Sequence, residues 1–389
     1  MSRTATRNHA IELVRIIACL LVIMAHIQVV INDGNSIVTG RLFFSTIIAD
    51  DVPLFLLVTG FFFFHRIHSD SDIVPAFPHK AKTFLSRIYI PTIAYIIINI
   101  LYRYFTGPQG SILTADWNYL GRFVFRLAPG DHLWYICTYM SFVFFFPMLA
   151  FVCQDTPQKN KMRRTLLGIA IGCAVITDIQ YFFKMNLLDI DKYLWGYCTI
   201  FLIIGYELSL FVRRFDNRKV KLILVGLGLY ILGIAVKILL QKYMHAEYGY
   251  IQNRFRWLQC SPCFVTATGL FITIYTLGSF IKAHGIPARI INFIGSCTFA
   301  IYLFHYIVIR ETKTWQFELI SKFSNISTFP DTAAYYFSFA FIVLAITFVI
   351  ALIFRFAVEK PVAWIFDRKK KSGIHAGPSG AIPPSGPSA

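Results

Sequence analysis

Residues 11–31 read IELVRIIACLLVIMAHIQVVI, and this run decides the class of the protein. About twenty mostly apolar residues are enough to cross a bilayer as a helix. Three ionisable residues nevertheless interrupt the run, Glu12, Arg15 and His26. Ionisable side chains inside a membrane span are energetically expensive, so their presence points to a functional site.

Arg15 and His26 lie on one face of this predicted helix. The two residues are eleven positions apart, which corresponds to about 16 Å along the helix axis and only about 20° around it. Glu12 precedes Arg15 by one helical turn and can pair with it. The helix therefore aligns a cation near one end of the span with a titratable imidazole beyond its middle.

The composition fits a polytopic membrane protein. Of the 389 residues, 56% are hydrophobic and 15% are charged, whereas globular domains are about 25% charged. We predict an all-α integral membrane fold with about ten spans. The predicted spans are roughly 11–31, 42–64, 85–105, 133–153, 164–183, 193–213, 220–240, 261–281, 289–309 and 336–358. For the second span we also consider a start near Val52, with an interfacial helix before it.

The formal net charge is +17. It does not indicate nucleic-acid binding, because the positive residues sit mostly in short loops on one side of the predicted spans. Such asymmetry marks the cytoplasmic side, so we predict that both termini are cytoplasmic. We expect residues 1–366 to form one transmembrane domain. Residues 367–389 are expected to form a basic and then Gly/Pro/Ser-rich, disordered cytoplasmic tail.

The predicted topology sorts the ionisable residues by depth. The outer group comprises His26, His305, His132, Asp178 and Asp51, and the inner group comprises Arg15, Arg66, Lys80, Lys82 and Arg87. Inner cations suit an anionic, phosphate-bearing donor. An outer histidine suits a general base, because its unperturbed pKa is about 6.5. This arrangement predicts group transfer across the membrane, over a distance comparable to an extended coenzyme A pantetheine arm.

Other interpretations of the same residues stay open. A histidine within a span can simply bond a neighbouring helix, and His132 with Trp134 can anchor an interface. Polar groups at two depths could also line the path of a transporter or flippase for a lipid-linked saccharide, although the sequence has no visible repeat. A non-enzymatic scaffold would not need Arg15 and His26 on one face. Cys260 and Cys263 form a CxxC pair, which we interpret as buried thiols rather than a redox or zinc site.

Six motifs in order resemble the acyltransferase 3 family of integral membrane acyltransferases. They are Arg15-IIACLLVIMA-His26, VPLFLLVTGFFFF at 52–64, FLSRIYIPTIAY at 84–95, HLWYICTYM at 132–140, SCTFAIYLFH at 296–305 and VEKP at 358–361. The resemblance covers about residues 10 to 365. The sequence departs from the family at Thr59, where the family usually has serine.

The resemblance implies transfer of an acyl group, usually acetyl, from cytoplasmic acyl-coenzyme A. The implied acceptor is a sugar hydroxyl of an envelope glycan or lipid-linked saccharide, and the implied location is a bacterial inner membrane. Acetyl-coenzyme A would be a co-substrate, and we expect no bound cofactor, no metal and no nucleic acid. Both direct transfer and an acyl-histidine intermediate remain open, as do donors with other acyl groups.

The resemblance also assigns roles to residues. His26 would be the catalytic base, and Arg15 would act with it by supporting the donor. Arg87 would help to bind acyl-coenzyme A. The residues expected to orient the acceptor are His132, Trp134, Tyr302 and His305, and the other motif positions are Glu12, Thr59 and Glu359.

Overall fold

The computed structural model describes residues 8–27, 32–33, 36–37, 39–65, 67–106, 131–185, 196–249, 255, 258–322 and 329–372. Within these ranges the regular secondary structure is helical apart from one short antiparallel ladder, β1 (Asn32–Asp33) with β2 (Ser36–Ile37). Eight of the described helical stretches are long and apolar enough to cross a membrane, and two bent helix pairs raise the number to ten if each pair is one span. The prediction of an all-α integral membrane protein is confirmed.

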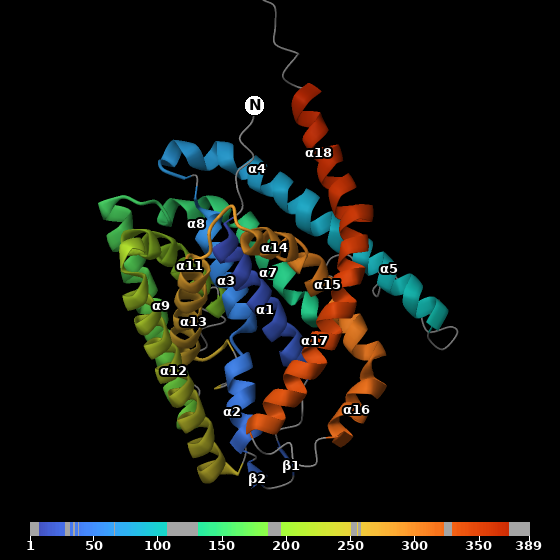
Figure 1. The fold of residues 1–389 in the computed structure, drawn as a ribbon. Helices are drawn as coiled ribbons and strands as arrows, with labels where there is room; N and C mark the ends of the chain where they lie inside the picture. The colour runs from blue at the N-terminus through green and yellow to red at the C-terminus, as the bar shows by residue number, and fades with distance from the viewer. Residues whose placement is uncertain are drawn as a thin grey trace, which may run out of the picture.

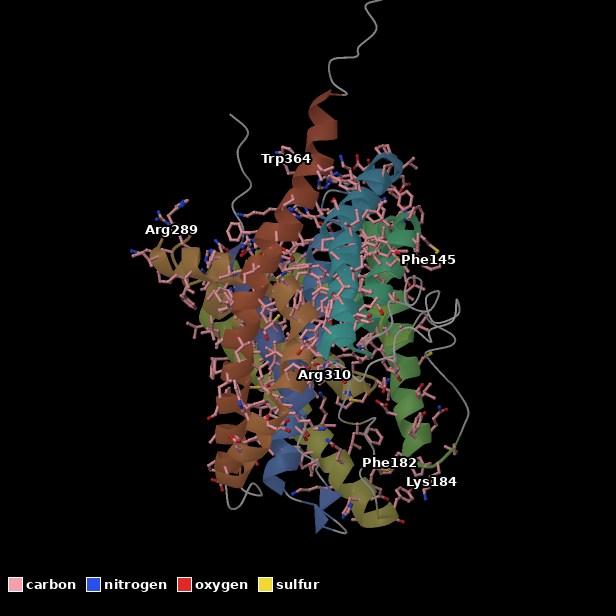
Figure 2. All side chains as sticks on the ribbon, turned by 90° about the vertical axis from the view of Figure 1, so that its right-hand side faces the viewer. Phe145, Phe182, Lys184, Arg289, Arg310 and Trp364 are labelled. Atoms are coloured by element: carbon pink, nitrogen blue, oxygen red, sulfur yellow. The ribbon has the colours of Figure 1, made fainter. Side chains whose placement is uncertain are left out.

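Figure 1 shows how the helices are arranged. Their bounds are α1 (His9–Ile27), α2 (Thr39–Ile48), α3 (Asp51–Phe63), α4 (Ile73–Phe84), α5 (Ile90–Thr106), α7 (Trp134–Phe144), α8 (Phe146–Val152), α9 (Pro157–Phe182), α11 (Gly196–Arg214), α12 (Lys219–Tyr248), α13 (Ser261–Gly278), α14 (Ile286–Gly295), α15 (Thr298–Glu311), α16 (Lys313–Lys322), α17 (Phe329–Phe354) and α18 (Lys360–Ser372). We call the end that carries the start of α1, together with α4, α14 and α18, the N-terminal face. Figure 2 places Arg289 and Trp364 at this face and Phe182 and Lys184 at the opposite end.

Helix α1 is the central element of the fold. It packs against α3, α13, α14, α15 and α17. Its side chains are buried around most of its circumference, including those of Ile11, Val14, Val22 and Met24. A helix that is apolar all round belongs in the interior of a large protein or a membrane domain. The first predicted span thus lies within the protein rather than against lipid.

Two predicted spans are bent rather than straight. The helices α7 and α8 meet at 71°, and α14 meets α15 at 57°. At the second bend, the Ser296 hydroxyl donates to the Phe293 carbonyl and the Thr298 hydroxyl donates to the Gly295 carbonyl. Hydroxyls that bond nearby carbonyls offer the backbone an alternative to a continuous helix. The predicted span 289–309 is therefore divided between α14 and α15.

The second span also contains a break, at Ala49–Asp50 between α2 and α3. Nevertheless, residues 42–63 pass together as one candidate span. Leu42, Phe44 and Ile48 of α2 are buried in the protein. The structure thus has one helix before a second that begins next to Val52, and the alternative of an interfacial helix followed by a span from Val52 stays a prediction.

Glycine lets α3 and α11 touch through their backbones. A Cβ at Gly60 would collide with the Leu202 carbonyl, and a Cβ at Gly205 would collide with the Leu57 carbonyl. Small residues at such positions allow close helix approach in membranes. This contact fixes the position of α3, which carries three residues of the candidate site, Phe55, Val58 and Thr59.

The domain boundary stays a prediction. Helix α18 runs through the predicted boundary at residue 366 and ends at Ser372. Residues 373–389 of the predicted tail lie outside the described residues, as do residues 28–31 of the first predicted span and Arg66 of the inner group.

Candidate active site

A cavity of about 450 Å³ reaches from the N-terminal face into the helix bundle. Helices α1, α3, α7 and α15 form its inner walls, while α4 and α18 contribute Thr83, Lys360 and Ala363 near the face. Arg15 and Arg87, which the sequence assigns to the donor, both line it. The structure brings these two cations together at one cavity, and their role in binding the donor stays a prediction.

Two π-helical segments line this cavity from opposite parts of the chain. Residues Leu85–Tyr89 join α4 to α5 and present Arg87, and residues Arg355–Glu359 join α17 to α18 and present Arg355 and Glu359. Single π-turns within helices are rare and frequently occur at functional sites. The extra residue in each turn changes which side chains face the neighbouring helices.

The cavity is strongly cationic. Arg15, Arg87, Arg355 and Lys360 line it, against one carboxylate, Glu359. Guanidinium groups bind phosphates in bidentate geometry. A cavity lined in this way is suited to an anion that carries phosphates.

Hydrogen bonds to neighbouring side chains orient two of these cations, Arg15 and Arg355. The Arg15 guanidinium donates to the Glu12 carboxylate at 3.2 Å, while the Arg15 side chain remains 35% exposed. Arg355 donates to the Ser296 hydroxyl and contacts the Cys297 thiol at 3.5 Å, at the bend between α14 and α15. Both side chains are therefore oriented before any ligand binds.

The three predicted histidines come together beyond the cavity. The His305 ring centroid lies 5.2 Å from that of His26 and 5.2 Å from that of His132. Tyr306 completes the group, since its ring lies 5.6 Å from His26 and stacks on His132 at 5.1 Å. The four rings come from α1, the turn before α7, and α15. We call them the histidine cluster.

Hydrogen bonds fix two of these imidazoles. The His132 Nε2 lies 3.2 Å from the Leu303 carbonyl, and the His305 Nδ1 lies 2.6 Å from the Tyr302 carbonyl. Because a carbonyl only accepts, these nitrogens carry the hydrogen in a neutral ring. The opposite atoms, His132 Nδ1 and His305 Nε2, are buried and have no hydrogen-bond partner among the described residues. Each of these two nitrogens can therefore accept a hydrogen bond from a hydroxyl group.

Tyr302 connects the cavity to the histidine cluster. Its side chain lines the cavity, and its hydroxyl donates to the His132 main-chain carbonyl. Its ring centroid lies 5.9 Å from those of His132 and His305. One residue therefore borders both the cationic cavity and the imidazoles.

The family model described as an acyltransferase domain, acyltransferase 3, matches residues 8–355. The chain belongs to the acyltransferase 3 family. This match takes in every helix from α1 to α17, so the protein is a multi-pass membrane acyltransferase. Among curated proteins and solved structures, none matches the chain.

The other motif residues of this acyltransferase have varied surroundings. Thr59 lines the cavity and bonds the Tyr135 hydroxyl at 2.7 Å. Glu12 is buried beneath Arg15. Trp134 is 39% exposed and is not part of the cavity lining. Its position suits an interfacial anchor better than an acceptor contact.

The acids predicted to accompany the histidines are engaged elsewhere. Asp178 accepts a hydrogen bond from the main-chain nitrogen of Ser261 at 2.6 Å, at the start of α13. Asp51 is buried at the start of α3, beside the break after Asp50. The predicted depth in the membrane placed both acids in one outer group with the histidines. Residues at the same depth can nevertheless lie on helices that are far apart in the plane of the membrane. The structure places neither acid among the rings of the histidine cluster.

Two inner cations and the CxxC pair also lie apart from the cavity. Lys80 sits over the Phe63 ring at 5.0 Å, and Lys82 is not in the cavity lining. Cys260 and Cys263 are both buried, and their thiols donate to the Phe255 carbonyl and to the Asp50 carboxylate, respectively. No group of three metal-binding side chains occurs in the part of the chain that the structure describes.

Sequence reasoning missed Arg355, Lys360 and Tyr306. The two cations stand at the end of the last predicted span, where Lys and Arg usually only set topology. Lys360 does belong to the quoted VEKP motif, and that motif was the available signal. Tyr306 follows His305 directly, but nothing in the sequence indicates that its ring stacks on His132.

Proposed function

We propose that this acyltransferase moves an acetyl group from cytoplasmic acetyl-coenzyme A to a sugar hydroxyl. The acceptor is an envelope glycan or lipid-linked saccharide of a bacterial inner membrane. The observation that carries the proposal is the position of Tyr302, which borders a cationic cavity on one side and the histidine cluster on the other. A phosphate-bearing donor and a hydroxyl acceptor would meet at this residue.

The donor enters from the N-terminal face in this mechanism. Its phosphates interact with Arg15, Arg87, Arg355 and Lys360, which line the cavity. The pantetheine arm then extends along α1. The separation of about 16 Å between Arg15 and His26 along the helix matches what such an arm must cover.

His26 removes the proton from the acceptor hydroxyl, and the oxygen attacks the thioester carbonyl carbon. The new carbon–oxygen bond forms, the carbon–sulfur bond breaks, and the sulfur leaves with the electron pair. The proton on His26 passes to this thiolate, which leaves as the thiol of coenzyme A. His132 and His305 orient the acceptor through their unbonded nitrogens. The same residues also permit a two-step route in which His26 carries the acetyl group.

Radiolabelled acetyl-coenzyme A tests this function directly. Purified wild type, His26→Ala, Arg15→Ala and a control, His284→Ala in an exposed loop, are assayed for donor binding and for label transfer to an envelope-glycan extract. We expect His26→Ala to bind the donor but to lose transfer by about 10²–10⁴-fold. Arg15→Ala should bind the donor poorly, and His284→Ala should match the wild type.

Two results would contradict the proposal. Full transfer by a folded His26→Ala protein would exclude His26 as the base. A wild type that neither binds nor consumes acetyl-coenzyme A would exclude the donor, and translocation of a lipid-linked saccharide should then be measured instead.

A further inference from the structure

The cavity ends at an aromatic residue on each of three helices. Helices α3 and α7 run toward the N-terminal face and α15 runs away from it (Figure 1). The lining residues farthest from that face are therefore Phe55 on α3, Tyr135 on α7 and Tyr302 on α15. Farther from that face, His132 in the turn before α7 and His305 on α15 do not line the cavity.

These three rings contact one another. The ring centroids of Phe55 and Tyr135 are 6.0 Å apart, those of Tyr135 and Tyr302 are 6.1 Å apart, and those of Phe55 and Tyr302 are 6.4 Å apart. Such distances are typical of packed aromatic pairs. We call the three residues the aromatic wall. It borders the deep end of the cavity, where the Tyr302 ring also lies beside the imidazoles of His132 and His305.

Hydrogen bonds hold two of the rings in place. The Tyr135 hydroxyl bonds Thr59 Oγ1 at 2.7 Å and the Phe55 carbonyl at 3.3 Å. The Tyr302 hydroxyl donates to the His132 carbonyl. Thr59 itself donates to the Phe55 carbonyl at 2.9 Å, so the hydroxyl at this motif position supports the wall. Phe55 has no polar side-chain atom, and its ring can be shortened without leaving a hydroxyl unpaired.

We propose that the aromatic wall sets the length of the acyl group that the enzyme accepts. The inference rests on the proposed donor. The phosphates of the donor are fixed at the cations, so its acyl end arrives at the wall. An acetyl group adds little bulk there, whereas a longer chain collides with three packed rings that cannot yield freely. Phe55, Tyr135 and Tyr302 are thus specificity-determining residues for the donor.

The test compares acetyl-, propionyl-, butyryl- and hexanoyl-coenzyme A as donors. The readout is kcat/KM for wild type, Phe55→Leu and Phe55→Ala. Each methylene is worth about 10–200-fold in a fixed apolar pocket, so the wild type should prefer acetyl over butyryl by at least about 100-fold. Phe55→Ala should raise the butyryl-to-acetyl ratio at least about tenfold, and Phe55→Leu should raise it by less.

Phe61→Leu is the matched control. Phe61 lies on the same helix, is buried and contacts Phe271 and Tyr275, but does not line the cavity. The butyryl-to-acetyl ratio of Phe61→Leu should equal that of the wild type. This control shows whether the change in the Phe55 variants comes from a wider cavity or from a general loosening of α3. If Phe55→Ala fails to fold, Phe55→Leu still decides through its butyryl-to-acetyl ratio.

Three outcomes would overturn the inference. The first is an active Phe55 variant with the wild-type ratio, and the second is a wild type that uses butyryl as well as acetyl. Both leave the proposed acyl transfer intact. The third is a wild type that uses none of the four donors, which removes the donor itself and the inference with it.

Discussion

Tyr302 donates its hydroxyl hydrogen to the main-chain carbonyl of His132. This bond joins α15 to the turn that begins α7, at the level where the cationic cavity gives way to the histidine cluster. Because both groups are buried, the bond is shielded from competing water. The relative position of the donor cavity and the imidazoles thus depends on one phenol.

Replacement of Tyr302 by phenylalanine should separate binding from chemistry. The variant keeps the ring but leaves a buried carbonyl without its donor, which costs about 1–3 kcal/mol. We expect kcat to fall about tenfold or more, while the KM for acetyl-coenzyme A stays near the wild-type value. Steady-state kinetics measures both constants. Tyr243→Phe, at an exposed ring stacked on Phe182, is the control, and an equal loss there would contradict the assignment.

Arg355→Ala should weaken donor binding. A hydrogen bond to a charged group contributes about 1.5–3 kcal/mol, so we expect the KM for acetyl-coenzyme A to rise at least about tenfold with kcat largely retained. Arg355→Lys should recover only part of the loss, because lysine lacks the planar fork. Arg289→Ala removes an exposed cation at the same face (Figure 2) and should change neither constant. A KM unaffected by Arg355→Ala would remove this residue from the donor site.

Gly60→Ala should destabilise the fold. The added methyl group would collide with the Leu202 carbonyl of α11, and overpacking of this kind costs about 1–3 kcal/mol or more. We expect a clearly lower unfolding temperature in detergent. Gly228→Ala has no atom within 4 Å of the new methyl group and should be neutral or slightly stabilising. Equal unfolding temperatures for the two variants would argue against the close approach of α3 and α11.

Lys237→Met should destabilise the protein without changing donor affinity. Lys237 and Asp50 are fully buried and paired at 2.9 Å, and Asp50 also accepts from Thr266 and Cys263. Loss of one partner of a buried pair costs about 3–5 kcal/mol. The double variant Asp50→Asn/Lys237→Met should regain part of the lost unfolding temperature. An acetyl-coenzyme A KM that changes in the double variant would show instead that the pair contributes to the donor site.

The sequence by itself determined the membrane class, the approximate spans and the alignment of Arg15 with His26. These features depend on local hydropathy and on the fixed geometry of a single helix, so neighbouring segments are not needed to predict them. The ordered motifs also named His132, Tyr302 and His305, which the structure brings into contact with one another.

Only the tertiary structure decided which of these residues meet. Topology gives the depth of a residue in the membrane, but it leaves the lateral position of its helix open. Asp178 was therefore grouped with His26, although it caps α13. Arg355 was overlooked, although a π-helical segment aims it into the cavity beside Arg15 and Arg87. The bend at Ser296 and the wall of Phe55, Tyr135 and Tyr302 depend on contacts between distant segments, and no local pattern encodes them.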